Sequence, residues 1–193
     1  MQDEQPNAGE ERAAHDAPIE AISADLLADV LRRAGYRVTA AEQNGAVQLM
    51  SASQGIGFAA RFGNPAPALV PQGADVEAAA RPYIDYTLSC VLQVQGDLPA
   101  ELVADWNRTK RFARLASHGP FLALEMDVVV AGGVSERYLR STIELWDRLI
   151  QEFLLHLRNR PAMAEQDAAR AAAGDPAPAA TADAAVREAA AQP

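Results

Sequence analysis

Few side chains in this chain are of the types that catalyse reactions. Glu125 and Asp127 lie two positions apart in "LALEMDVVV", so on a strand they share one face, as paired catalytic carboxylates would. The only thiol is that of Cys90. A cross-strand ion pair from Arg114 explains Glu125 more simply, and the apolar face of a strand explains Cys90. We therefore expect no catalytic residue and no enzymatic activity.

The three histidines do not form a metal site in the sequence. His15 lies near the N-terminus, His118 at the tip of an expected hairpin, and His156 on the outer part of the last expected helix. A metal site needs several converging ligands, and no cysteine or histidine spacing provides them. Gly132 and Gly133 lack the other glycines and the lysine of a phosphate loop, which indicates a turn. We expect neither a metal nor a cofactor.

The stretch "DWNRTKRFARL", residues 105–115, is the one segment in which cationic and aromatic side chains alternate. Such a pattern is typical of nucleic-acid binding, and recognition through the segment Arg108–Arg114 is the alternative function that we keep open. A solvated helix end, with cations favoured by the helix dipole, is the simpler interpretation. In that interpretation the Trp106 indole fills the core, the Asn107 amide satisfies nearby backbone groups, and Arg114 faces Glu125.

Composition divides the chain into three parts. Residues 1–18 and 161–193 are rich in alanine, proline and acids, and we expect both to be disordered tails around one folded domain, residues 19–160. The tails carry net charges of −4 and −3 out of −9, so the domain carries −2 and does not attract phosphate over distance.

The acidic start lacks the features of a secretory signal, no apolar run could span a membrane, and one cysteine suits a reducing compartment. We expect a cytoplasmic protein without membrane contact.

Local patterns predict the elements of the first half. A helix over Ser23–Ala34 has Ser23 as its N-cap. Two short strand-like runs flank Asn44–Gly45, a dipeptide that favours a tight hairpin. A third strand covers Ile56–Phe62, and the proline-rich segment Gly63–Pro82 reads as a surface loop, with one helical turn at Ala74–Ala80.

The second half has the stronger patterns. Alternating apolar residues predict a strand over Tyr83–Val94, and a helical period predicts a helix over Leu98–Lys110. A hairpin turning at Gly119–Pro120 would place His118 opposite Phe121 and Arg114 opposite Glu125. The last helix runs from Ser135, its N-cap, to Arg160, and its apolar seam consists of Leu139, Ile143, Trp146, Ile150, Phe153 and Leu157.

Together these elements predict an α+β fold. We expect the order α-β-β-β-α-β-β-α, with an antiparallel sheet and the helices packed on one side of it, because the helices are too few to connect parallel strands.

Several of these segments carry a resemblance. "DWNRTKRFARL", then "LALEMDVVVAGGVS", then "LWDRLIQEF" on a long helix, resemble the YbjN family of bacterial sensory transduction regulators, over about residues 83–157. The first half agrees in element order more than in letters. The family is similar in fold to type III secretion chaperones.

The resemblance implies a function without catalysis. It implies a regulatory or chaperone-like module that binds another protein, forms a homodimer and is linked to stress or motility regulation. By the same analogy the dimer would use the second helix and the neighbouring strand. We expect contacts with a protein partner or a second copy at Trp106, Asn107, Arg108, Arg111 and Arg114. The partner's identity does not follow from the sequence.

Overall fold

The computed structural model describes residues 18–43, 46–66, 80–94, 98 and 101–159, with residues 161, 165, 168, 169 and 172. Almost all of the two expected tails, the Asn44–Gly45 dipeptide and the helical turn expected at 74–80 lie outside the described residues. Among the described residues, no helix combines the length and the apolar character that a membrane crossing requires.

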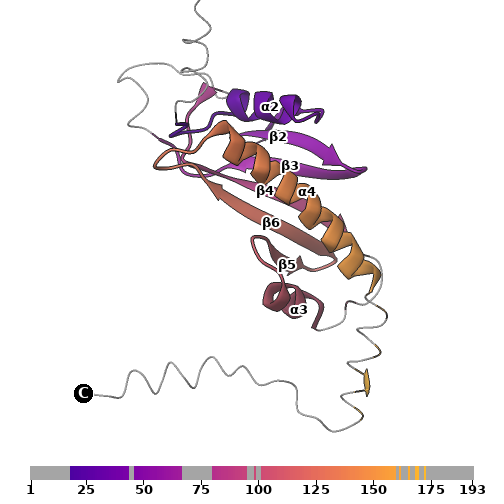
Figure 1. Cartoon of the computed structure of the whole chain (residues 1–193). Coiled ribbons are helices and arrows are strands. Elements are labelled where there is room, and N and C mark those ends of the chain that lie inside the picture. The colour runs from indigo at the N-terminus through magenta and orange to yellow at the C-terminus, as the bar shows by residue number, and fades with distance from the viewer. Residues whose placement is uncertain are drawn as a thin grey trace, which may run out of the picture.

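A six-stranded antiparallel sheet forms the centre of the fold (Figure 1). Its strands follow the spatial order β1-β2-β3-β4-β6-β5, so β1 and β5 are the edges. The bounds are β1 Thr39–Gln43, β2 Ala46–Ser53, β3 Ile56–Phe62, β4 Asp85–Gln93, β5 Arg114–His118 and β6 Phe121–Val129. The helices are α2 Ala24–Arg33, α3 Glu101–Thr109 and α4 Glu136–Arg158.

The α+β class and the antiparallel sheet are confirmed, and the expected order is wrong by one strand. Four strands precede α3 instead of three, because both runs beside Asn44–Gly45 pair as β1 and β2, and β3 and β4 follow.

Two serine caps begin the helices where the sequence predicts. The Leu26 amide donates a hydrogen bond to Ser23 Oγ at 3.2 Å, and the Tyr138 amide donates to Ser135 Oγ at 3.1 Å. Each cap satisfies one of the amides that a first helical turn leaves without a partner. After α2 the chain turns at Gly35, whose φ of 92° is open to glycine at no steric cost.

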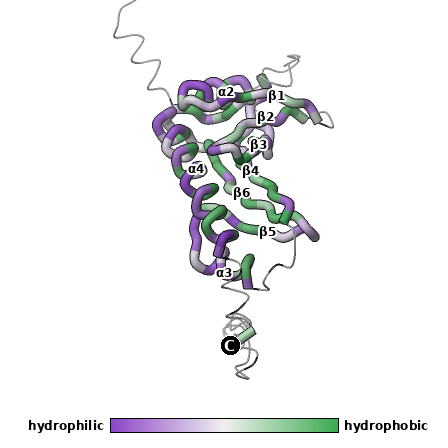
Figure 2. The backbone as a smooth tube through the Cα atoms, turned by 90° about the vertical axis from the view of Figure 1, so that its right-hand side faces the viewer, coloured by the Kyte–Doolittle hydropathy of each residue, from purple (hydrophilic) through white to green (hydrophobic). Residues whose placement is uncertain are grey.

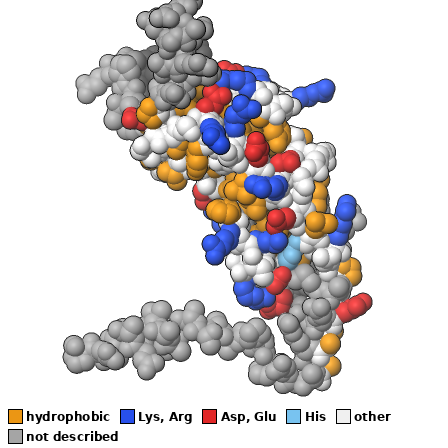
Figure 3. All heavy atoms as spheres, in the orientation of Figure 1, with side chains coloured by type: hydrophobic (Ala, Val, Ile, Leu, Met, Phe, Trp, Pro, Cys, Tyr) orange, Lys and Arg blue, Asp and Glu red, His pale blue; other side chains and the backbone are white. Residues whose placement is uncertain are grey.

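The core lies between one face of the sheet and the three helices. In α4 the seam residues Leu139, Ile143, Trp146, Ile150 and Phe153 are buried, as the heptad pattern predicts. They meet Leu88, Leu124 and Met126 of the sheet within one hydrophobic cluster. The helix α4 runs diagonally across the sheet, and the turned view places it on one side of the strands (Figures 1 and 2). On this side, basic and acidic side chains are interspersed (Figure 3).

No described helix covers the opposite side of the sheet, which we call the open face. The cross-strand pairs Met50–Ala59, Ala59–Ser89 and Ser89–Glu125 place one row of residues on it. The residues that share this face by the same alternation are Thr39 and Ala41 of β1, Ala46, Gln48, Met50 and Ala52 of β2, Gly57, Ala59 and Arg61 of β3, Asp85, Thr87, Ser89, Val91 and Gln93 of β4, Arg114, Ala116 and His118 of β5, and Phe121, Ala123, Glu125, Asp127 and Val129 of β6.

The hairpin of β5 and β6 has the predicted register. His118 pairs with Phe121 and Arg114 with Glu125, and the chain turns at Gly119–Pro120. The register therefore sends Leu115 and Leu124 to the core and Arg114 and Glu125 to the open face.

Candidate functional site

The Trp106 side chain lies inside the protein. It is buried on the inner side of α3, and its ring packs edge to face on Phe153 of α4, with centroids 5.9 Å apart. Its Nε1 donates a hydrogen bond to the carbonyl oxygen of Ala113 at 3.0 Å. A buried indole needs such an acceptor, and the bond ties α3 to the chain just before β5. The interpretation of Trp106 as a core residue is confirmed.

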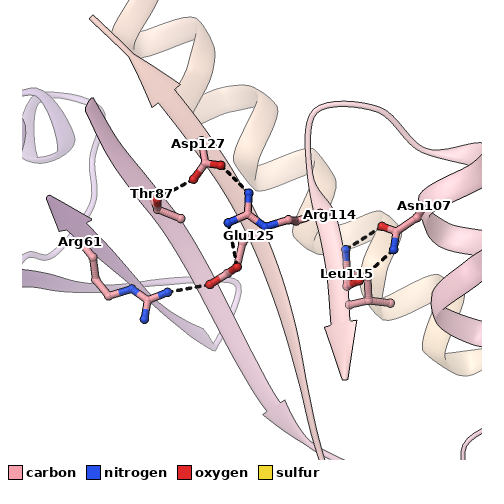
Figure 4. A network of polar contacts seen from close by, with 7 residues as sticks. All are labelled: Arg61, Thr87, Asn107, Arg114, Leu115, Glu125 and Asp127. Carbon is pink, nitrogen blue, oxygen red and sulfur yellow. Dashed lines mark hydrogen bonds and ion pairs between the residues drawn. The ribbon is translucent and has the colours of Figure 1, made fainter. Parts of the chain in front are cut away.

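The Asn107 amide completes the edge strand β5 (Figure 4). Its Nδ2 donates to the carbonyl oxygen of Leu115 at 2.9 Å, and its Oδ1 accepts from the Leu115 amide at 2.9 Å. In an antiparallel pair every second residue directs both backbone groups away from its neighbour strand. Asn107 satisfies both groups of Leu115, as a residue of a seventh strand would. The internal interpretation of this amide is confirmed too.

His156 lies against α3, so the prediction that it belongs to the outer part of the last helix is wrong. Its Nε2 lies 2.8 Å from the carbonyl oxygen of Leu102, and its ring centroid lies 5.4 Å from that of Trp106. Because a carbonyl oxygen only accepts, Nε2 carries the hydrogen. Lys110 Nζ lies 5.8 Å from the Trp106 ring centroid and 2.7 Å from Glu152. Both ends of α3 are thus fastened to α4.

The cations of the segment 108–114 differ in how far they are paired. Arg108 contacts Asp105 at 2.8 Å and Glu101 at 3.7 Å, all on α3. Arg111 is exposed and has no hydrogen bond or ion pair with any described residue. Of the arginines predicted to meet a partner, Arg111 is the one whose guanidinium is free to do so.

Arg114 and the two carboxylates form a network on the open face (Figure 4). Arg114 bridges Glu125, at 3.0 Å, and Asp127. Arg61 of β3 donates to Glu125 at 2.7 Å, and Thr87 of β4 donates to Asp127 at 2.6 Å. The predicted pairing of Arg114 with Glu125 is confirmed, while the contributions of Arg61 and Thr87 depend on strand order, which the local pattern does not reveal.

The network favours the charged form of Asp127. Hydrogen bonds from Arg114 and then Thr87 lower the pKa of Asp127 below its usual 3.8, and the bond to Asp127 raises the pKa of Arg114. A general acid that works near neutral pH requires the opposite, a raised carboxyl pKa. Asp127 therefore suits ion pairing better than proton donation.

Phe112 is an exposed aromatic beside this network. Its side chain is 71% exposed, and its φ of 72° is a conformation that bulky residues rarely adopt. It borders a shallow cavity of about 440 Å³ that is lined by Asn107, Phe112, Ala113, Arg114, Glu125 and Asp127. Phe112 is one of the two aromatic residues of the segment 105–115, but it was not predicted at the partner contact, because an exposed aromatic in this conformation leaves no periodic pattern.

Cys90 is a buried residue of the core face, as its strand position predicts. Burial raises the pKa of its thiol to about 11. The thiol is therefore protonated at neutral pH, and a protonated thiol is a poor nucleophile.

One family model matches part of the chain. Residues 85–159 match the model of the YbjN family, whose description is "Putative bacterial sensory transduction regulator". This segment starts with β4 and ends just after α4, so it contains every part of the site except Arg61. Neither the curated proteins nor the solved structures gave a match. The expected likeness to type III secretion chaperones stays a prediction.

Proposed function

We propose, from the YbjN match over residues 85–159, that the chain is a regulatory module of sensory transduction that works by binding another protein. The family match supports a regulatory role. The proposal goes further in assigning protein binding without catalysis, in the cytoplasm, and a link to stress or motility regulation.

One observation carries the protein-binding part of the proposal. Trp106 and Asn107 use their polar groups inside the fold, whereas Arg111 and Phe112, a few residues later, are exposed, and Arg111 has no described partner. Aromatic and arginine side chains are the ones that most often dominate protein interfaces. We therefore assign the partner contact to Arg111 and Phe112, with Arg108 and Arg114 beside them.

We also propose that the chain forms a homodimer, as the resemblance implies. Trp106 and Asn107 then contribute indirectly, because they hold α3 against β5, and they do not touch the second copy.

Nucleic-acid binding has less support. Lys110 and Arg114 are paired with acids, and Arg108 contacts two acids of its own helix. Nucleic-acid binding by counterion release requires cations that are free to contact phosphate. A gel-shift assay of RNA and DNA at low salt tests this alternative. Retardation that weakens in an Arg111→Ala variant would favour it over protein binding.

Partner capture from the native bacterial cell tests the proposed function. The purified full chain serves as bait beside two charge reversals, Arg111→Glu and Arg148→Glu. Arg148 is an exposed arginine of α4 outside the proposed contact. Because both variants replace one arginine by glutamate, the control has the same net charge as Arg111→Glu. We expect a partner that is retained by the wild type and by Arg148→Glu and is lost with Arg111→Glu. Equal retention by both variants would contradict the assignment, and no specific partner in any sample would contradict the function.

A further inference from the structure

Exposed apolar side chains gather on the open face of the sheet. Of the seven large hydrophobic residues that are exposed in the described part of the chain, four lie there: Met50, Val91, Phe121 and Val129. Phe112 lies two residues before β5, and the remaining two, Tyr138 and Leu155, lie on α4. A side of a sheet that faces water permanently usually carries polar residues, so four exposed apolar side chains on one face favour its contact with a partner.

Charges of opposite sign lie on either side of the central strand β4. Arg61 of β3 pairs across the sheet with Thr87 of β4, and Thr87 pairs with Asp127 of β6, so these residues form one row. Arg61 is one end of the network in Figure 4, and Asp127 lies near its other end, between Arg114 and Thr87; the side chains of Arg61 and Asp127 are 52% and 51% exposed. Each has capacity for a further ion pair. A guanidinium has five donors, and a carboxylate has about four lone-pair sites, of which Thr87 and Arg114 each use one on Asp127.

This arrangement is complementary to itself. A two-fold axis that lies between two facing sheets and runs along β4 places β3 of one copy over β6 of the other. Arg61 then faces Asp127 of the second copy, and the same contact recurs by symmetry, as in any isologous interface. Val91 lies on β4 itself, so it faces its own equivalent. Ala59, Ser89 and Ala123, on the same face, have small side chains, and Ser89 and Ala123 are buried beneath their neighbours.

We propose that the open face binds a second copy of this chain through this two-fold arrangement. The inference rests on the proposed homodimer and gives it a surface, which is the sheet face and not the outer side of α3.

The size of the open face fits this occupant. A two-fold axis along β4 places β2 over β5 and β3 over β6, so five of the six strands pair and β1 has no strand opposite it. Five strands ~4.8 Å apart and nine-residue strands rising ~3.3 Å per residue give a face of at most roughly 700 Å². Each partner contributes ~800 Å² to an interface of standard size. A pairing of these five strands is thus close to what a stable dimer needs.

The first test introduces a charge at the axis. The mass of the wild type, Val91→Lys and Leu155→Lys is measured by sedimentation equilibrium from low to high micromolar concentration. Val91 and Leu155 are 54% and 56% exposed, so the two substitutions are matched in exposure and differ in place. We expect a dimer for the wild type and Leu155→Lys, and a dissociation constant at least tenfold weaker for Val91→Lys. A monomeric wild type, or equal behaviour of the two variants, would overturn the proposal.

The second test exchanges the charges. Arg61→Glu and Asp127→Arg each place like charges opposite one another in their own homodimers, so each variant alone should dissociate. An equimolar mixture restores both opposite-charge contacts, and we expect heterodimers in it. Circular dichroism checks that both variants fold. If either does not, the Val91 comparison decides.

Each outcome of the exchange has one meaning. Failure of the folded variants to associate when mixed would overturn the two-fold arrangement. The Val91→Lys comparison changes no residue of the proposed partner contact, so the failure of this interface can be told from the failure of the proposed function.

Discussion

Replacement of Asn107 by alanine removes the side chain that completes the edge of β5. Two hydrogen bonds to Leu115 are lost, at 2.9 Å each. A typical intramolecular hydrogen bond contributes ~1 kcal/mol net, so we expect the free energy of unfolding to fall by ~2 kcal/mol. With a urea m-value of ~2 kcal/mol/M, this loss lowers the unfolding midpoint by ~1 M.

Urea unfolding followed by tryptophan fluorescence measures the effect, with Arg108→Ala as the control. Arg108 is the next residue on α3, and its ion pairs are exposed, so its loss should cost less than ~1 kcal/mol. The reasoning is refuted if Asn107→Ala changes the free energy of unfolding by less than ~0.5 kcal/mol, or by no more than Arg108→Ala does.

Amide hydrogen exchange locates the effect in the chain. In the wild type the Leu115 amide donates to Asn107 Oδ1. In Asn107→Ala it should exchange faster than the amides of β5 that donate to β6. Uniform acceleration across β5 would instead indicate that the whole hairpin loosens.

Three further predictions concern acid, backbone strain and thiol access. Arg114 and Thr87 lower the pKa of Asp127, so its charged form stabilises the fold above pH ~4. This contribution is lost as the pH falls through the lowered pKa. Asp127→Asn should therefore flatten the decline of the unfolding free energy between pH 5 and pH 2. Phe112→Gly should leave the thermal midpoint unchanged or raise it, because it relieves a left-handed conformation that costs ~1–2 kcal/mol and removes an exposed ring; a large drop in the midpoint would show that the ring packs. The Cys90 thiol should react with Ellman's reagent only on unfolding, since it is buried with a raised pKa, and rapid reaction in native buffer would contradict its position.

The β5–β6 hairpin and α4 could be predicted because their specification is local. Gly119–Pro120 fixes the turn, and counting outward from it sets Arg114 opposite Glu125. The spacing from Leu139 to Phe153 identifies the buried side of α4 without knowledge of what it packs against. Patterns of this kind depend on neighbours a few residues away.

The site depends on contacts that no local pattern contains. Asn107 lies eight residues before Leu115, and its amide meets that backbone only because α3 folds back along the edge of β5. Arg61 and Glu125 are 64 positions apart in the chain. They meet because their strands, β3 and β6, lie on the two sides of β4. His156 was placed outside because the heptad seam does not show that α3 covers the end of α4.

The completed edge of β5 also limits how copies of this sheet could polymerise. A fibril built by strand pairing needs two free sheet edges on every subunit, one for the subunit before it and one for the subunit after it. Here Asn107 hydrogen-bonds to the backbone of Leu115 on the edge strand β5, and β1 is the other edge strand. A strand that adds to β5 must first displace Asn107 from both backbone groups of Leu115, which disfavours growth at this edge.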